Sequence, residues 1–297
     1  MVILFFVLGM AFGSFGYVIA LRYDGEHFLL DPKIIGGRSY CPHCRKTLRW
    51  FELIPFVSFA IQGGKCRNCK VRIGFIYPVL ELFAGFLFVT VAARVQAFYG
   101  IMGAGFWILS VLWIAFFFAL FVLSIIDIRL GIIPDELVVF LCVIAVCVIG
   151  FSVAHQGTPS QILQGKTWEG VPNISFFGPY AAFFGLQKNI WINHIIGALI
   201  GMLFFGGLVA LTRGKGMGMG DVKLALPLGF LFGWPDILFL TAFAFVSGAV
   251  IGLWNIGKGT KTMKSALPFG PFLAVGAVFI FFCGSGFMNW YLHTIGM

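Results

Sequence analysis

Two aspartates of this chain stand beside long apolar stretches, where an ionisable side chain is costly and therefore a functional candidate. Asp127 follows the apolar run at 116–126, and Asp221 follows a glycine-rich turn and opens another apolar stretch. In that turn Gly218 and Gly220 permit positive φ angles and close backbone approach, so another chain could lie against them. Two carboxyl groups at helix ends on one side of a membrane predict a pair that shares a proton and activates water.

The neighbouring acids Asp135 and Glu136 have a structural explanation. They follow Pro134 at the start of an apolar run, and acids in the first turn of a helix are stabilised by the helix dipole. Asp127 is expected at a helix C-terminus, where the dipole disfavours an anion, whereas Asp221 is expected at an N-terminus, where the dipole favours one. Such opposed surroundings suit a division into acid and base roles.

Two pairs of cysteines, Cys41 with Cys44 and Cys66 with Cys69, each enclose two residues, and 21 residues separate the pairs. This spacing is close to that of a zinc ribbon. Four thiolates complete a tetrahedral site with no open position, so the pattern predicts one structural Zn²⁺. Unligated thiols are the alternative, and disulfides are disfavoured if this segment faces the reducing cytoplasm.

The composition determines which elements must position these groups. The chain has 297 residues, of which 60% are apolar and 10% charged, with a mean hydropathy of +0.99. This excludes a soluble globule and predicts an all-α polytopic membrane protein. The apolar runs predict about eight transmembrane helices, the sixth being short, at 2–22, 76–98, 103–126, 132–154, 191–212, 222–236, 237–256 and 266–292.

The basic residues predict how these helices are oriented. With alternating crossings, 17 of the 20 lysines and arginines fall on one side, which the positive-inside rule assigns to the cytoplasm. Segments 23–75, 213–221 and 257–265 are then cytoplasmic, and the loop at 155–190 and both termini lie outside. Topology therefore accounts for the net charge of +9, and no nucleic-acid partner is expected.

In their order along the chain, these motifs resemble those of the bacterial type IV prepilin peptidases, including their type II secretion counterparts. The resemblance covers most of the chain, and the ordered set is far more specific than any one motif. Its parts are Gly13-Ser14-Phe15 with Arg22, the cysteine pairs, Tyr77-Pro78 with Glu81, Asp127 with Ile133-Pro134-Asp135, the Gly-x-Gly-Asp motif ending at Asp221, and Pro268 to Phe272.

The resemblance implies a bifunctional enzyme of the bacterial inner membrane. Its substrates would be prepilins and pseudopilins, whose basic leader it would remove after a glycine on the cytoplasmic side. Asp127 and Asp221 would be the catalytic pair, with Gly218 and Gly220 in the loop beside the substrate. The division of the chain would be a first transmembrane helix at 1–22, a zinc-binding domain at 23–75 and a membrane-embedded peptidase domain at 76–297.

The family's second activity is N-methylation of the new amino terminus, with S-adenosyl-L-methionine as the methyl donor. No recognisable site for this donor is present in the sequence, and Glu81 is a candidate contact. An acid one turn into a membrane helix is otherwise expected to pair with a partner such as a basic residue of the cytoplasmic domain.

Two departures from the family pattern keep alternatives open. Tyr17 stands where the family usually has asparagine, and Ile76 stands where an arginine usually precedes Tyr-Pro. A leader peptidase without methyltransferase activity is therefore one alternative. The other is a proton-coupled transporter that uses Asp127, Glu81 and Asp221, although a transporter site is expected near the membrane midplane. The sequence specifies neither the oligomeric state nor which prepilin is cut.

Overall fold

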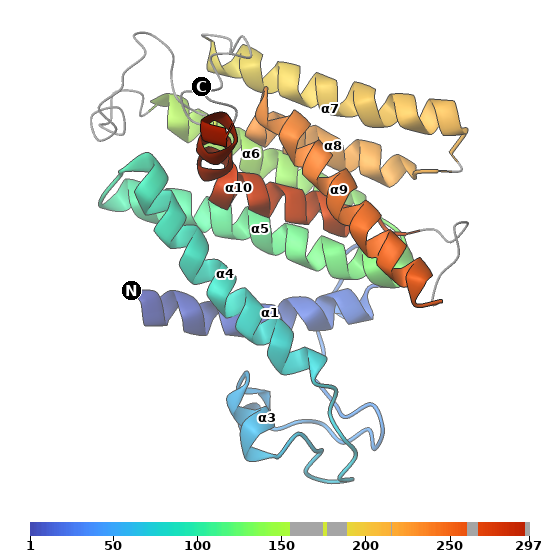
Figure 1. Ribbon diagram of the computed structural model, residues 1–297. Helices are drawn as coiled ribbons and strands as arrows, with labels where there is room; N and C mark the ends of the chain where they lie inside the picture. The colour runs from blue at the N-terminus through green and yellow to red at the C-terminus, as the bar shows by residue number, and fades with distance from the viewer. Residues whose placement is uncertain (155–174, 177–188, 215, 260–266, 295–297) are drawn as a thin grey trace. The chain divides into compact units, whose positions relative to one another are not determined.

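The computed structural model describes residues 1–154, 175–176, 189–214, 216–259 and 267–294 (Figure 1). The chain divides into two compact units, 1–97 and 98–297, which are described separately here. In the described residues the regular structure is helical, and seven helices are long and apolar enough to cross a membrane. The expected all-α, multi-pass membrane fold is thereby confirmed.

The first unit is built on two long helices that approach closely. A Cβ atom at Gly9 would lie 2.5 Å from the carbonyl oxygen of Ala84, and one at Gly13 would lie 2.6 Å from the Ala84 Cβ. Small residues are what allow membrane helices to pack at this distance. The helices of this unit are α1 (Val2–Arg22), α2 (Pro32–Ile35), η1 (Trp50–Leu53), α3 (Val57–Ile61) and α4 (Ile76–Tyr99), of which α4 extends two residues beyond it.

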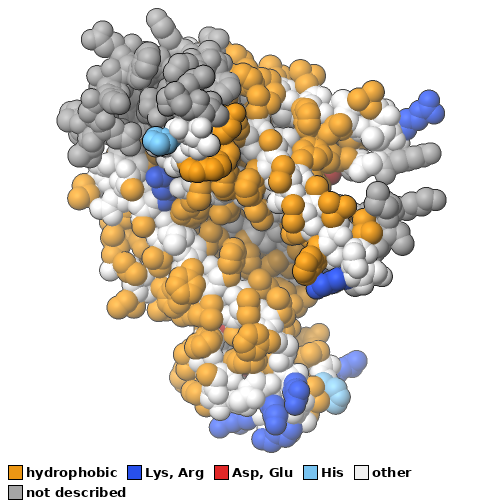
Figure 2. All heavy atoms as spheres, in the orientation of Figure 1, with side chains coloured by type: hydrophobic (Ala, Val, Ile, Leu, Met, Phe, Trp, Pro, Cys, Tyr) orange, Lys and Arg blue, Asp and Glu red, His pale blue; other side chains and the backbone are white. Residues whose placement is uncertain are grey.

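The small polar domain between α1 and α4 contains little regular structure. Its two cysteine turns are each closed by an isolated bridge, between Tyr40 and Thr47 and between Lys65 and Arg72. The Arg22 guanidinium at the end of α1 donates hydrogen bonds to the carbonyl oxygens of Ile34, at 3.2 Å, and Gly36, which fixes the chain after α2. Lys and Arg side chains gather along the lower edge of this domain in the view of Figure 2.

The described residues of the second unit form a bundle of six helices. The helix α10 packs against α5 and α9, α6 packs against α5 and α8, and α7 packs along α8 (Figure 1). The helices are α5 (Ala104–Leu130), α6 (Asp135–Ala154), α7 (Ile190–Thr212), α8 (Met219–Phe232), α9 (Asp236–Gly257) and α10 (Gly270–Thr294).

The sixth expected span corresponds to α8, which is shorter than its neighbours. It has 14 residues, and at 1.5 Å per residue it is about 21 Å long, less than the hydrocarbon core of about 30 Å. Side chains of α7 donate hydrogen bonds to backbone carbonyl groups at and just after the C-terminal end of α8. His194 Nδ1 donates to the Phe230 carbonyl at 2.7 Å, and Asn193 Nδ2 donates to the Trp234 carbonyl at 2.9 Å. Buried protein donors of this kind allow a helix to end within a membrane.

An aromatic cluster fills the centre of the second unit. Trp113 of α5 is buried, and its ring lies 4.5 Å from that of Phe281 on α10 and 6.0 Å from that of Phe232 on α8. Phe176 joins this cluster at 5.5 Å from Trp113. Large buried rings of this kind contribute much of the packing energy of a core.

Phe176 comes from the segment 155–190 that was expected to form an outside loop. Within that segment only Ser175, Phe176 and residues 189–190 belong to the described residues. The carboxylate of the fully buried Asp236 accepts hydrogen bonds from the Ser175 hydroxyl and from the Phe176 backbone N–H, the latter at 2.7 Å. These bonds attach the segment to the start of α9.

Candidate active site and metal centre

Asp127 lies in the last turn of α5, whose end is set by the residue that follows. Gly131 adopts the left-handed conformation with φ of 68°, and its N–H bonds to the Asp127 carbonyl at 2.8 Å. Glycine is favoured at this position because a side chain would be strained there. The expected end of this span at 126 is therefore four residues too early. The Asp127 side chain is 5% exposed and points into the protein.

The beginning of α10 supplies a hydrogen bond to Asp127. The backbone N–H of Gly270 donates to Asp127 Oδ2 at 2.9 Å. A Cβ atom at Gly270 would lie 2.7 Å from the same oxygen, so a side chain would displace the carboxylate. The first residue of α10 thus lies directly against the Asp127 carboxylate.

Asp221 lies in the first turn of α8, as the glycine-rich turn before it predicted. Gly218 is the residue before the helix, and the Asp221 N–H bonds back to its carbonyl at 3.3 Å. A Cβ atom at Gly220 would meet Ile133 at 3.2 Å, so Gly220 allows the turn to pack against the segment that precedes α6. At Gly218 the nearest atom to such a Cβ is the Gly220 backbone nitrogen at 3.9 Å, an ordinary van der Waals contact.

The fold brings the two aspartates together from distant parts of the chain. Asp221 is 7% exposed, and the charge of Asp127 acts on it directly. Two carboxyl groups in such proximity cannot both ionise easily, so they favour a state in which one proton is shared between them. This arrangement is capable of general acid and base catalysis with water.

Asp135 has a partner that sequence reasoning missed. It stands in the first turn of α6, and Lys223 Nζ contacts its two carboxylate oxygens at 2.7 and 3.0 Å. Lys223 follows Asp221 by two residues on α8, so the pair links the starts of α6 and α8. Both side chains are largely exposed, and exposed ion pairs contribute little stability.

The four cysteines of the first unit form a cluster that could hold a metal ion. Their sulfur atoms all lie within 4.8 Å of one another, and Cys41 lies 3.9 Å from Cys69 and Cys44 lies 4.0 Å from Cys66. These separations are close to the ~3.8 Å edge of a tetrahedron with Zn–S bonds of about 2.3 Å, and too long for disulfides. Backbone N–H groups of Cys69 and Asn68 lower the pKa of the Cys66 thiol to about 6, because they stabilise the thiolate.

Glu81 has a structural partner inside the first unit. Its Oε2 accepts the backbone N–H of Phe56 at 2.7 Å, so the expected pairing with the polar domain is made through the backbone and not through a basic side chain. The carboxylate holds the chain just before α3. Tyr17, one of the departures from the family pattern, packs its ring against Tyr77 at 4.9 Å.

Comparisons with known proteins agree with these motifs. The model of the bacterial peptidase A24 N-terminal domain matches residues 7–95, and that of the type IV leader peptidase family matches residues 114–253. The first range contains the four cysteines and the second contains both aspartates. No solved structure matches the chain.

Three curated relatives are each called prepilin leader peptidase/N-methyltransferase. The protein from Bacillus subtilis (strain 168) is 28% identical over 98% of each chain. The protein from Stutzerimonas stutzeri is 29% identical over 91% of this chain and 86% of its own. The protein from Burkholderia pseudomallei (strain 1026b) is 32% identical over 84% of this chain and 68% of its own. With this identity and coverage, the chain belongs to the type IV leader peptidase family.

Proposed function

We propose that this chain is a membrane aspartyl endopeptidase and methyltransferase that acts on type IV prepilins or pseudopilins. It removes the basic leader after a glycine and then N-methylates the new amino terminus. Family membership and the names of the curated relatives support both activities. The observation that carries the peptidase assignment is the buried pair of Asp127 and Asp221, contributed by the last turn of α5 and the first turn of α8.

The pair performs cleavage by moving protons. The ionised carboxylate takes a proton from water, and the oxygen of that water attacks the carbonyl carbon of the scissile peptide. The neutral carboxyl donates its hydrogen bond to the carbonyl oxygen. Proton transfer to the leaving nitrogen then allows the C–N bond to break, and the pair returns to its single shared proton. The Gly-x-Gly turn at Gly218 and Gly220 borders the extended substrate, since glycine allows another backbone to approach closely.

The second activity uses S-adenosyl-L-methionine, which supplies the methyl group to the amine that cleavage releases. We assign no residue to this donor, because Glu81 accepts a hydrogen bond from Phe56 and thereby has a structural role. The alternative is a leader peptidase without methyl transfer. The departures from the family pattern at Tyr17 and Ile76 are what suggest it.

The first unit is proposed to bind one structural Zn²⁺ through Cys41, Cys44, Cys66 and Cys69. The near-tetrahedral separation of the sulfur atoms supports this metal. We place the chain in the bacterial inner membrane with the domain at 23–75 and both aspartates facing the cytoplasm and both termini outside. The uneven distribution of Lys and Arg supports this orientation.

A leader-peptide cleavage assay in detergent tests the pair. Asp127→Asn and Asp221→Asn should each abolish cleavage, and the double variant should be hardly worse, because residues that act as a unit are not additive. Wild-type activity should fall at both low and high pH, since one carboxyl must be ionised and the other protonated.

Asp135→Asn is the matched control, because it neutralises an acid near the same helix ends. It should keep its cleavage activity and lose roughly 0.3–1 kcal/mol of stability, from the helix dipole and the exposed pair with Lys223. Full cleavage by either single variant of the pair would remove that residue from the mechanism.

A further inference from the structure

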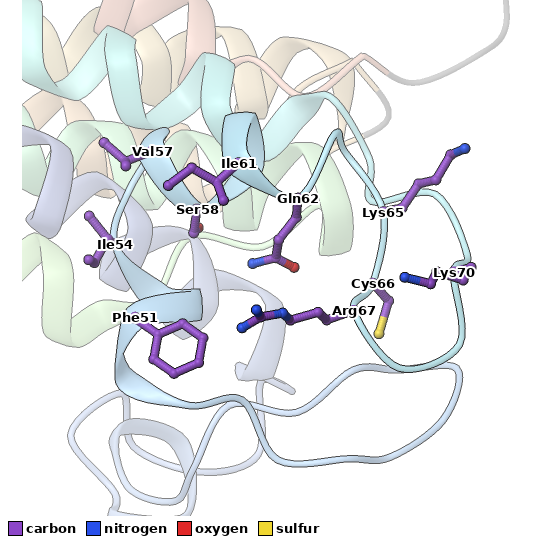
Figure 3. A pocket seen from close by; sticks show the side chains of 10 residues that line it. All are labelled: Phe51, Ile54, Val57, Ser58, Ile61, Gln62, Lys65, Cys66, Arg67 and Lys70. Atoms are coloured by element: carbon purple, nitrogen blue, oxygen red, sulfur yellow. The ribbon is translucent and has the colours of Figure 1, made fainter.

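A cavity of about 440 Å³ lies between α3 and the second cysteine turn of the first unit (Figure 3). Its two sides differ in chemistry. One side is apolar, and the other carries the cations next to the metal cluster. The residues that matter here are Ile54, Val57 and Ile61 on the apolar side and Lys65, Arg67 and Lys70 on the basic side.

The helix α3 is held beside the start of the membrane helix α4. The Phe56 N–H immediately before α3 donates to Glu81, which lies five residues into α4. The ring of Phe59 in α3 lies 5.7 Å from that of Phe75, which directly precedes α4. Five residues of helix rise by about 7.5 Å. The cavity is therefore close to the level at which α4 enters the membrane.

The apolar side chains beside the cavity are not covered by the described protein. Ile61 is 81% exposed, and Ile54 and Val57 are also exposed. Large apolar side chains gathered on one exposed face mark a contact surface.

In the part of the chain that the structure describes, the cations of the cavity form no ion pair with an acid. Among the described residues, the recorded ion pairs involve Asp24 and Asp135, neither of which contacts Lys65, Arg67 or Lys70. The Arg67 guanidinium instead lies over the ring of Phe51, 5.2 Å from its centroid. Figure 3 shows the Arg67 side chain pointing toward this ring. Three cations with no carboxylate partner among the described residues, beside exposed apolar groups, fit a ligand that has phosphate and hydrocarbon together.

We propose that this face, formed by α3 and the cations Lys65, Arg67 and Lys70, docks on the anionic lipid surface of the membrane that α1 and α4 cross. The three cations bind lipid phosphates, and the apolar side chains enter the boundary of the acyl chains. A basic leader peptide does not fit this face, because its charge has the same sign. The docking would hold the metal domain flat against the membrane.

Hydrogen–deuterium exchange of the full-length, zinc-loaded protein in lipid nanodiscs tests this. Discs of phosphatidylcholine alone are compared with discs that also contain phosphatidylglycerol. Amide exchange in peptides covering 50–62 and 65–72 should slow by about tenfold or more in the anionic discs, as three cations at an anionic surface imply. About 1 M salt should reverse the slowing, because it screens charges beyond about 3 Å.

Matched charge variants identify the face. The triple variant Lys65→Gln, Arg67→Gln, Lys70→Gln should lose the lipid-dependent slowing and keep its zinc. The control triple Lys33→Gln, Arg38→Gln, Arg45→Gln removes the same charge from residues that do not line the cavity, and it should keep the slowing.

Several results would overturn the proposal. Equal exchange in both kinds of disc would exclude recognition of anionic lipid. If the control triple variant loses the slowing of exchange to the same extent, the effect depends on net charge and not on this face. Slowing by glycerol phosphate added to phosphatidylcholine discs, as large as that in anionic discs, would indicate a site for a free anion. If the first triple variant loses zinc, the proposal is judged on the wild-type protein alone, by its exchange in the two kinds of disc and at low and high salt.

Discussion

Gly270 lies so close to the Asp127 carboxylate that no side chain fits between them. A methyl group there would lie 2.7 Å from Asp127 Oδ2 and would displace the carboxylate. We expect Gly270→Ala to lower the cleavage rate roughly 100-fold, the cost of a displacement of about 1 Å in a catalytic group. Turnover at saturating leader peptide measures this.

A second glycine of α10 is the control for that substitution. Nothing lies within 4 Å of a Cβ atom at Gly286, so Gly286→Ala should leave cleavage unchanged. Equal activity of the two alanine variants would mean that cleavage does not depend on the close approach of Gly270 to the Asp127 carboxylate.

At the level of single residues, the sequence indicates which side chains could be reactive but not which atoms hold them in position. Asp127 and Asp221 stand out because acids are rare in this composition. The Gly270 N–H, 143 positions from Asp127, belongs to no local pattern, since any residue except proline has such a donor. Asn193 and His194 were missed for another reason. They are polar residues in an apolar span, a signal that was available and indicates pairing in the protein interior.

The contact between α7 and α8 depends on glycine on both helices. A Cβ atom at Gly197 would lie 2.5 Å from the Gly229 carbonyl oxygen, which is rigid backbone. We expect Gly197→Ala to lower stability by about 1–3 kcal/mol, the usual cost of overpacking, and to reduce cleavage because α8 carries Asp221. Thermal unfolding in detergent, together with the leader-peptide assay, provides the measurement.

Gly207 is the matched position on the same helix, because a Cβ atom there has open space around it. Gly207→Ala should be neutral or slightly stabilising. If Gly197→Ala unfolds at the same temperature as Gly207→Ala, the close approach of α7 and α8 is not what holds them together.

The cysteine cluster should bind one zinc ion per chain. Cys66→Ser combined with Cys69→Ser removes two thiolates, so the purified variant should lose its zinc, and the small domain should unfold because its folding is coupled to the metal. Metal analysis of the purified protein measures the loss. Cys142→Ser with Cys147→Ser is the control, since these thiols lie on α6 and outside the cluster. The same zinc content in both double variants would disprove the site.

Helix positions were largely predictable from hydrophobicity, whereas helix ends were not. The expected first and fifth spans agree with α1 and α7 within one residue. α5 was expected to end at 126 and continues to Leu130, since the apolar run is shorter than the helix that Gly131 terminates. The shortness of α8 was visible in the sequence, but the α7 side chains that pair its end were not identified.

The orientation of the whole chain in the membrane remains a prediction from charge. We expect a cysteine at position 160 to be labelled from outside and one at position 260 from the cytoplasm, in a protein from which Cys142, Cys147 and Cys283 have been removed. Both positions lie outside the described residues. Labelling of both from one side would refute eight alternating crossings.

For the molecule as a whole, the ordered motifs were sufficient to predict the fold class and the family. Composition determined the class because a chain that is 60% apolar cannot form a soluble surface. What the sequence did not reveal were the contacts between distant segments, such as Asp236 with Ser175 and Phe176, which no periodicity encodes.

The aromatic cluster at Trp113 has a consequence for cells that store energy as a proton gradient. Trp113 precedes Asp127 by 14 residues on α5, which corresponds to about 21 Å along the helix. Hydrolysis requires water at the aspartates, and a continuous file of water through the bundle would conduct protons. The rings of Phe176, Phe232 and Phe281 are buried and lie within 6.0 Å of the buried Trp113 ring, and we expect this cluster to close that route. The bundle would then admit water to the carboxylates without conducting protons across the energised membrane.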